Sequence, residues 1–279
     1  MFNQILLGVD GSGRSREMMN MLLPLPSMAR AQINILHVVP WQVTSEGLTE
    51  YRLAGERILA KEAQNLKLGS QNTCVQILKE GEPKDVVCQV AAELKPDLLI
   101  MGSRGMGRLQ SILANSVSQY VFQLTSVPML LIKDDVYIKS VRRVMVALNK
   151  SAIAAGSLES AISLIAGQKD IEIVLLRIGK QGEEVKAETD ESIQQAIAKL
   201  TRLGIPHRLL IRQGEVGKEI CRAVEEANPS LLVLGSPDRR PSIARSLPDL
   251  DRLLGNSVSD YVRVNASCPV LLTRNPEPA

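Results

Sequence analysis

The sequence predicts an α/β protein made of two tandem doubly wound (Rossmann-like) domains, each a five-stranded parallel sheet flanked by helices. Three observations lead to this fold class. The chain has 279 residues, enough for two domains. Residues 81–103 align without a gap on residues 214–236, and each copy alternates short apolar runs with amphipathic segments. Because only 3% of the residues are aromatic, we expect aliphatic cores, as in buried parallel sheets.

The first copy shows its strands as apolar runs, which are expected at residues 5–9, 33–39, 75–78, 98–101 and 129–132. A methionine-rich helix follows the first strand and is interrupted by Pro24 and Pro26. Further helices are expected at residues 46–66, 84–94 and 116–124. Right-handed crossovers between parallel strands place the ligand crevice of such a sheet at the carboxyl ends of its strands.

The second copy begins the same pattern at residues 144–148 and keeps it almost to its end. Residues 115–121 recur as residues 256–262 after a longer loop. The two copies are separated by a polar stretch near residues 134–140. We therefore expect a first domain at residues 1–136 and a second at residues 137–279.

The composition argues against several classes of function. Lysine and arginine number 33 against 30 acidic residues, a net charge of +3, so no strong field draws nucleic acid or an anionic membrane to the protein. No apolar run approaches the roughly 18 to 20 residues that a membrane span needs, and the first residues form a strand rather than a cleavable signal. The expectation is a cytoplasmic protein with neither partner.

Metal chemistry is not expected either. The four cysteines are scattered and never form a Cys-x-x-Cys pair, and the chain has only two histidines. We interpret the cysteines as reduced, apolar residues of a cytosolic protein. His37 lies within an apolar strand and is interpreted as a core histidine.

Three stretches of the first copy lie where predicted strands end. Residues 10–12 (Asp-Gly-Ser) follow the first strand, Val38 and Val39 end the second, and a glycine-rich loop from Gly102 follows the fourth. The glycines allow backbone to approach a ligand closely, although glycine also marks an ordinary tight turn. Asn115 and Ser116 then begin a helix, whose unpaired amides favour an anion. This combination favours a nucleotide, while neither a Walker loop nor a dinucleotide fingerprint is present.

With these motifs the sequence resembles the universal stress protein family in its tandem form. Nucleotide-binding members carry Gly-x-x-Gly, nine residues, and then Gly followed by Ser or Thr. The corresponding stretch here is Gly102-Ser-Arg-Gly105, nine residues, and Asn115-Ser116, so the length matches and the last glycine is replaced by asparagine. A second class of the family lacks the motif and does not bind nucleotide.

The resemblance implies that Asp10 bonds to adenine or ribose, that Val39 presents its backbone to adenine, and that Gly102, Gly105 and Ser116 hold ribose and phosphates. The ligand would be ATP or AMP, with or without Mg²⁺ at Asp10. No catalytic residue and no resident metal are expected. The full set of residues expected to bind nucleotide is Asp10, Gly11, Ser12, Val38, Val39, Gly102, Arg104, Gly105, Gly107, Asn115, Ser116 and Val117.

The second copy departs from this pattern. Asn149 stands where the first copy has Asp10, and Pro237 and Asp238 break the glycine motif after Gly235. A carboxylate at position 238 would also repel phosphates. We therefore expect the second domain to be degenerate as a nucleotide site.

The leading hypothesis is a regulatory, stress-response protein that binds an adenine nucleotide in its first domain and acts on a protein partner that the sequence does not identify. The alternative is a nucleotide-free interaction or scaffold module of the same fold. An enzyme is not expected, beyond weak ATP hydrolysis. From the resemblance, the last strands of the two copies would pair as an intramolecular pseudo-dimer, and a homodimer of whole chains stays open.

Overall fold

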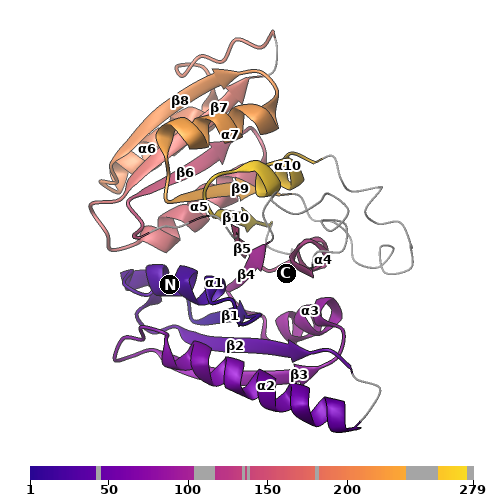
Figure 1. Ribbon diagram of the computed structural model, residues 1–279. Coiled ribbons are helices and arrows are strands. Elements are labelled where there is room, and N and C mark those ends of the chain that lie inside the picture. The colour runs from indigo at the N-terminus through magenta and orange to yellow at the C-terminus, as the bar shows by residue number, and fades with distance from the viewer. Residues whose placement is uncertain are drawn as a thin grey trace. The chain divides into compact units, whose positions relative to one another are not determined.

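The computed structural model describes residues 1–41, 45–103, 117–133, 136, 139–179, 182–236 and 257–274 (Figure 1). The described residues form two compact units, which divide between Asp134 and Asp135. We call the part up to residue 133 unit 1 and the part from residue 136 onward unit 2.

Unit 1 is a parallel sheet of five strands in the order β3-β2-β1-β4-β5. This order places β1 at the centre and lets the chain wind outward in both directions, as the sequence predicts. The elements are β1 (Gln4–Gly8), α1 (Arg14–Leu22), a 3₁₀ turn η1 (Pro26–Met28), β2 (Gln32–Val39), α2 (Ser45–Gln64), β3 (Thr73–Glu80), α3 (Pro83–Leu94), β4 (Leu98–Ser103), α4 (Val117–Leu124) and β5 (Met129–Lys133).

Unit 2 repeats the arrangement with the order β8-β7-β6-β9-β10, again all parallel. The predicted fold class, two tandem doubly wound domains with five-stranded parallel sheets, is thereby confirmed. Its elements are β6 (Arg143–Leu148), α5 (Ala152–Ile165), β7 (Glu172–Gly179), α6 (Glu191–Arg202), β8 (His207–Gln213), α7 (Val216–Ala227), β9 (Leu231–Gly235), α10 (Val258–Asn265) and β10 (Val270–Thr273).

The duplication is visible in the backbone as well as in the sequence. Helices α3 and α7 both end on a residue in the left-handed conformation, Lys95 with φ 47° and Asn228 with φ 44°. The turns that precede these helices contain Gly81 and Gly214, with φ 143° and 145°. Such values are costly for any residue with a Cβ, so the two glycines are needed where they are.

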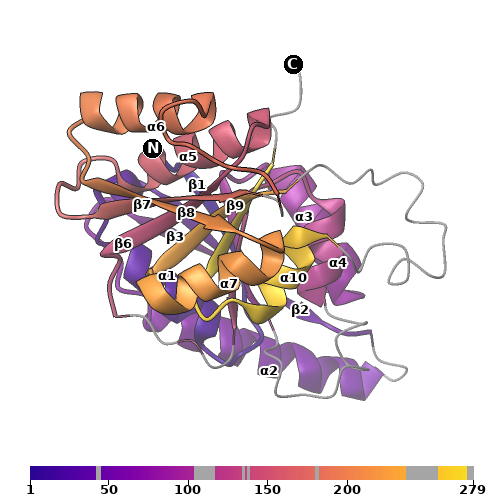
Figure 2. The same cartoon turned by 90° about the horizontal axis from the view of Figure 1, so that it is seen from above.

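The sheets are buried between two layers of helices. In unit 1, α3 and α4 pack side by side, and α7 and α10 do the same in unit 2 (Figure 2). The central strands are almost entirely aliphatic and inaccessible, as Ile5, Leu6 and Leu7 of β1 show, each with 0% exposure. Burial of these strands on both faces supplies most of the driving force for folding.

Candidate functional site

A cleft of about 510 Å³ opens in unit 1 where β1, β2 and β4 end. Helices α2 and α3 form its walls, and the beginning of α4 closes the side next to β4. Its lining residues are Gly8, Val9, Asp10, Leu36, His37, Val38, Val39, Pro40, Tyr51, Ala54, Gly55, Ile58, Pro83, Val87, Met101, Gly102, Ser103, Val117 and Ser118.

Five of the residues predicted to bind nucleotide therefore line one cavity: Asp10, Val38, Val39, Gly102 and Val117. Gly11 and Ser12 belong to the turn that follows Asp10. The other five predicted residues lie outside the described residues, and they are Arg104, Gly105, Gly107, Asn115 and Ser116.

Asp10 begins a tight turn at the end of β1. Its Oδ1 accepts a hydrogen bond from the amide of Ser12 at 2.9 Å, and Gly11 and Gly13 adopt φ of 85° and 84° to complete the turn. Partial shielding from solvent raises the pKa of Asp10, but hydrogen bonds from the side chain and amide of Ser12, with the charge of Arg14, outweigh it. The pKa of Asp10 therefore lies below its ordinary value, and the cleft holds a carboxylate at neutral pH.

His37 contributes to the cleft, contrary to the prediction of a core histidine. The side chain is half-buried, and Nδ1 lies 2.9 Å from the carbonyl oxygen of Val9. Because a carbonyl oxygen only accepts, this contact is a hydrogen bond when Nδ1 carries a proton and donates to it. The sequence does not reveal that His37 lines a cleft, because His37 lies within an apolar run. The position is decided by the sheet, in which the pairing of β1 with β2 ends at Gly8 and Leu36, one residue before His37.

At the end of β2, the backbone amide and carbonyl groups point alternately toward β1 and toward β3. The amide of Val9 donates to the carbonyl of Leu36 at 2.9 Å, on the side of β1. The carbonyl of Val39 accepts from the amide of Gly81 at 3.0 Å, on the side of β3. Since the polar groups of a strand alternate in direction, those of Val38 face the same side as those of Leu36, beyond the last β1–β2 pair.

Helix α2 supplies a wall of the cleft that the sequence motifs do not predict. Tyr51, Gly55 and Ile58 line the cleft at the spacing of one helical face. This spacing is the signal that the sequence offers, but the same spacing is typical of a face packed on the core. Trp41, which follows β2 by two residues, has 77% of its surface exposed and is not among the lining residues.

Below the Asp10 turn, a buried ion pair joins α1 to α2. Nη1 of Arg16 lies 3.4 Å from Oε2 of Glu62, whose side chain is 1% exposed. A Cβ at Gly13 would lie 2.6 Å from Nη2 of the same arginine. Burial, outweighing the nearby charge of Arg16, raises the pKa of Glu62 above its ordinary value.

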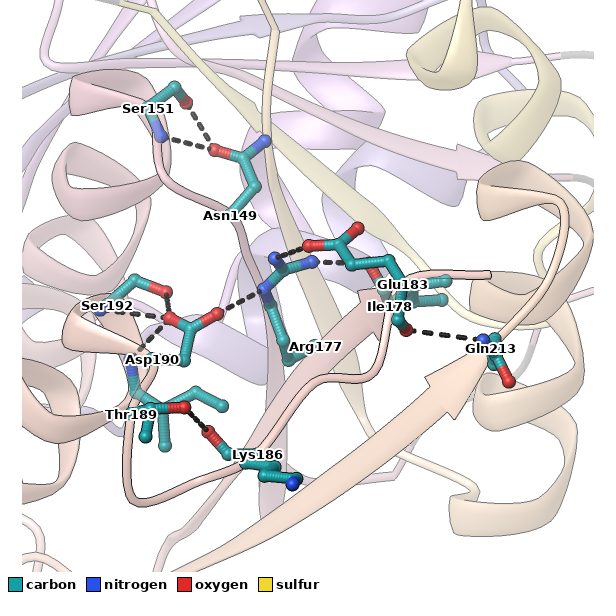
Figure 3. Close-up of polar contacts among 11 residues, drawn as sticks. Asn149, Ser151, Arg177, Ile178, Glu183, Lys186, Thr189, Asp190, Ser192 and Gln213 are labelled. Carbon is teal, nitrogen blue, oxygen red and sulfur yellow. Dashed lines mark hydrogen bonds and ion pairs between the residues drawn. The ribbon is translucent and has the colours of Figure 1, made fainter. Parts of the chain in front are cut away.

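Unit 2 keeps the turn at the end of its first strand but changes the charge. Oδ1 of Asn149 accepts from the amide of Ser151 at 2.8 Å, as Asp10 does from Ser12 (Figure 3). A cavity of about 620 Å³ lies at these strand ends. Arg177 occupies the place of His37, because Ala147 pairs with Leu176 as Gly8 pairs with Leu36.

Two kinds of feature were sought in the described ranges: clusters of metal-ligating side chains and helices that could span a membrane. There, no group of three or more His, Cys, Asp or Glu side chains is placed to hold a metal ion. Within the same ranges, no helix is both long enough and apolar enough to cross a bilayer.

Comparison with known proteins agrees with the fold. A profile of the universal stress protein family matches residues 1–133 and 140–274. Universal stress protein YxiE of Bacillus subtilis is 30% identical over 152 residues, 48% of this chain and 100% of that protein. A universal stress protein A-like protein of Arabidopsis thaliana is 40% identical over 60 residues, 22% of this chain and 34% of that protein. The crystal structure of a universal stress protein from Archaeoglobus fulgidus has a TM-score of 0.78 and 22% identity, covering 99% of this chain and 97% of that chain.

Proposed function

The chain belongs to the universal stress protein family, and from its unit 1 cleft we propose that it is a regulatory protein that binds an adenine nucleotide, ATP or AMP. The observation that carries the proposal is that Asp10, Val38 and Gly102, which lie far apart in the sequence, line one cleft at the carboxyl ends of parallel strands. This is where doubly wound sheets bind their ligands. The volume, about 510 Å³, lies within the usual range of small-molecule sites.

We assign the adenine ring of the nucleotide to the end of β2. Val38 turns its backbone amide and carbonyl toward the space beyond the end of β1, where a donor and an acceptor on a purine edge would pair with them. We assign this role to Val38 rather than Val39, because the carbonyl of Val39 already accepts from Gly81. Apolar side chains of α2, such as Ile58, would pack against the ring.

We assign the sugar to Asp10 and the phosphates to the opposite end of the cleft. An ionised Asp10 accepts hydrogen bonds from ribose hydroxyls, and a divalent ion such as Mg²⁺ would suit the same oxygen ligands. Among the described residues, a Cβ at Gly102 would meet only the Oγ of Ser15, at 4.0 Å, so a ligand can approach the backbone there. The beginning of α4, at Val117 and Ser118, adds the positive end of a helix.

Regulation would follow from a difference in affinity. If the nucleotide binds one state of unit 1 more tightly than another, occupancy shifts the population toward that state, and a protein partner that recognises it receives the signal. We assign no catalytic residue to this function.

A nucleotide-free interaction or scaffold module of the same fold is the second candidate. The observation that favours it is Asn115, which stands where nucleotide-binding members of the family carry glycine. Under this function the cleft of unit 1 would take no adenine nucleotide at millimolar concentration.

The test is calorimetric titration of AMP and of ATP into three proteins: the wild type, Asp10→Ala and Asn149→Ala. The two variants remove the corresponding turn-forming side chains, Asp10 from unit 1 and Asn149 from unit 2. We expect binding in the wild type and in Asn149→Ala, and at least about a tenfold loss of affinity in Asp10→Ala. No binding in the wild type would favour the scaffold module, and equal losses in both variants would contradict the assignment to unit 1.

A further inference from the structure

The cavity at the strand ends of unit 2 differs from the unit 1 cleft in one of its walls. In unit 1, helix α2 forms that wall, through Tyr51 and Gly55 among others. In unit 2, α6 begins only at Glu191, and the chain between β7 and α6 places Glu183 in the wall. The cavity of about 620 Å³ is therefore open and has a volume that suits a small organic molecule.

Much of the lining of this cavity is apolar. Leu176 and Ile178 come from β7, Ile220 comes from α7 and Val258 from α10. Contact with these side chains would remove apolar surface of a ligand from water, which is the main source of affinity in such sites. An apolar ligand body matches this part of the cavity.

The turn at the end of β6 gives the cavity a positively charged end. Oδ1 of Asn149 accepts from the amide of Ser151 at 2.8 Å, so Nδ2 is the atom of this side chain that can donate to a ligand (Figure 3). The corresponding atom of Asp10 in unit 1 is a carboxylate oxygen. Lys150 follows where unit 1 has Gly11, and it lines the cavity. Two successive exchanges thus turn a site for hydrogen-bond donors into a site for an anion.

Arg177 and Glu183 form a wall in which charge is already paired. Arg177 is 5% exposed, and its Nη2 donates to Oε1 of Glu183 at 3.1 Å while Nε donates to Oδ2 of Asp190 at 3.0 Å (Figure 3). Two carboxylates on one guanidinium leave this wall with one negative charge in excess. An anionic group of a ligand is therefore favoured beside Lys150 rather than beside Glu183.

The opposite end of the cavity, at the start of α10, disfavours phosphate. Ser257 and Ser259 line it, and Oγ of Ser257 donates to Oδ2 of Asp260 at 2.7 Å. Asp260 is 4% exposed, pairs with Arg263 at 3.7 Å and stands where unit 1 has Gln119. A carboxylate in the first turn of a helix repels a second anion at the same helix end. The end that the proposed function of unit 1 gives to phosphates is thus acidic in unit 2.

We propose that the cavity of unit 2 is a second ligand site, and that it binds an organic carboxylate with an apolar body. The carboxylate accepts from Lys150 and from Nδ2 of Asn149, and the apolar body packs against β7 and α7. One facing cation matches a monoanion better than a phosphate monoester, which carries about 1.5 to 2 negative charges at pH 7. This site is separate from the nucleotide cleft proposed for unit 1 and does not depend on it.

Calorimetric titration of millimolar octanoate tests the charge of the turn. Asn149→Asp restores the carboxylate of unit 1 and keeps the turn, because Asp10 forms the same turn. We expect Asn149→Asp and Lys150→Gln each to weaken octanoate binding about tenfold. Asp10→Asn in unit 1 and Lys169→Gln, at an exposed lysine of unit 2, should leave it unchanged within about twofold. No binding to the wild type, or equal losses in the controls, would overturn the proposal.

Three further titrations test the class of ligand and its place. The wild type should bind octanoate about tenfold more tightly than octan-1-ol or octyl phosphate, and equal or tighter binding of either would overturn the assigned class. Glu183→Gln removes the opposing charge while keeping an oxygen for Arg177, so octanoate should bind about threefold more tightly or better. Saturating AMP should leave octanoate affinity unchanged, and displacement of octanoate by AMP would contradict the placement in unit 2. Failure of AMP itself to bind would bear on unit 1 alone.

Discussion

Gly55 of α2 lies against the imidazole ring of His37, so closely that a Cβ at position 55 would be 3.0 Å from Cδ2 of the ring. The same Cβ would lie 2.8 Å from Cδ1 of Leu78 and 3.0 Å from Cγ2 of Val39. Glycine at this position therefore lets the helix approach the end of β2 without displacing these side chains. One wall of the cleft depends on that approach.

Gly55→Ala should destabilise unit 1 even though alanine is the better helix former. The clash with three side chains is expected to cost about 1–3 kcal/mol, against a gain of about 1 kcal/mol in helix propensity. Gly156→Ala, in a helix with open space around it, should stabilise by about 0.5–1 kcal/mol. The free energy of unfolding of both variants, measured in urea, tests this prediction. A Gly55→Ala protein more stable than wild type would mean that the side chains packed against Gly55 move aside at little cost.

Asp10→Asn should preserve the turn, because Asn149 forms the same turn in unit 2. Asp10→Ala should lose about 1 kcal/mol, since the amide of Ser12 loses its acceptor. The lowered pKa also fixes the pH dependence. The stability from ionised Asp10 is present above the unfolded-state pKa and is lost as pH falls through the lower folded-state pKa. Asp10→Asn should remove that acid-dependent loss, which thermal unfolding between pH 7 and pH 3 would measure.

Asp190→Ala should be strongly destabilising for unit 2. Burial raises the pKa of Asp190, but hydrogen bonds from Ser192 and Arg177 outweigh it and lower the pKa overall. The charged form is thus stabilising above the unfolded-state pKa, and the contribution disappears as pH falls through the lowered value. Removing one partner of this buried pair is expected to cost about 3 kcal/mol at pH 7. Glu188→Ala, in the same segment, is the control for chemical denaturation, and equal costs would speak against the ion pair.

Glu62→Gln should stabilise unit 1 at neutral pH. Burial raises the pKa of Glu62, so its carboxylate opposes folding increasingly as pH rises from the unfolded-state pKa through the raised folded-state pKa. A neutral isostere avoids the cost of the buried charge, with a gain of about 1 kcal/mol at pH 7 and none in acid, where Glu62 itself is neutral. Glu17→Gln alters the other, exposed carboxylate near Arg16 and should change little. A destabilised Glu62→Gln protein would show that the pairing with Arg16 dominates.

Much of the fold follows from local patterns in the sequence. The repeat and the alternation of apolar runs predict two parallel sheets of five strands, and both are observed. The turn at Asp10 was predictable because its short polar side chain and glycines act within a few residues. The ends of β1, β2 and β4 meet in one cleft because the carboxyl ends of parallel strands lie at the same edge of the sheet. This placement follows from the topology of the sheet and was therefore predictable.

Whether a side chain near a strand end faces core or cleft was decided only by the tertiary structure. His37 and Arg177 occupy equivalent positions in apolar strands, and their surroundings depend on where the neighbouring strand stops and on which segment crosses above. Arg177 is buried because Glu183 and Asp190, which come later in the chain, fold back onto it. The sequence by itself determined the elements and their order, since these rest on short-range periodicity. The lining of the cleft in unit 1 and of the cavity in unit 2 depends on contacts between distant residues, which no local pattern encodes.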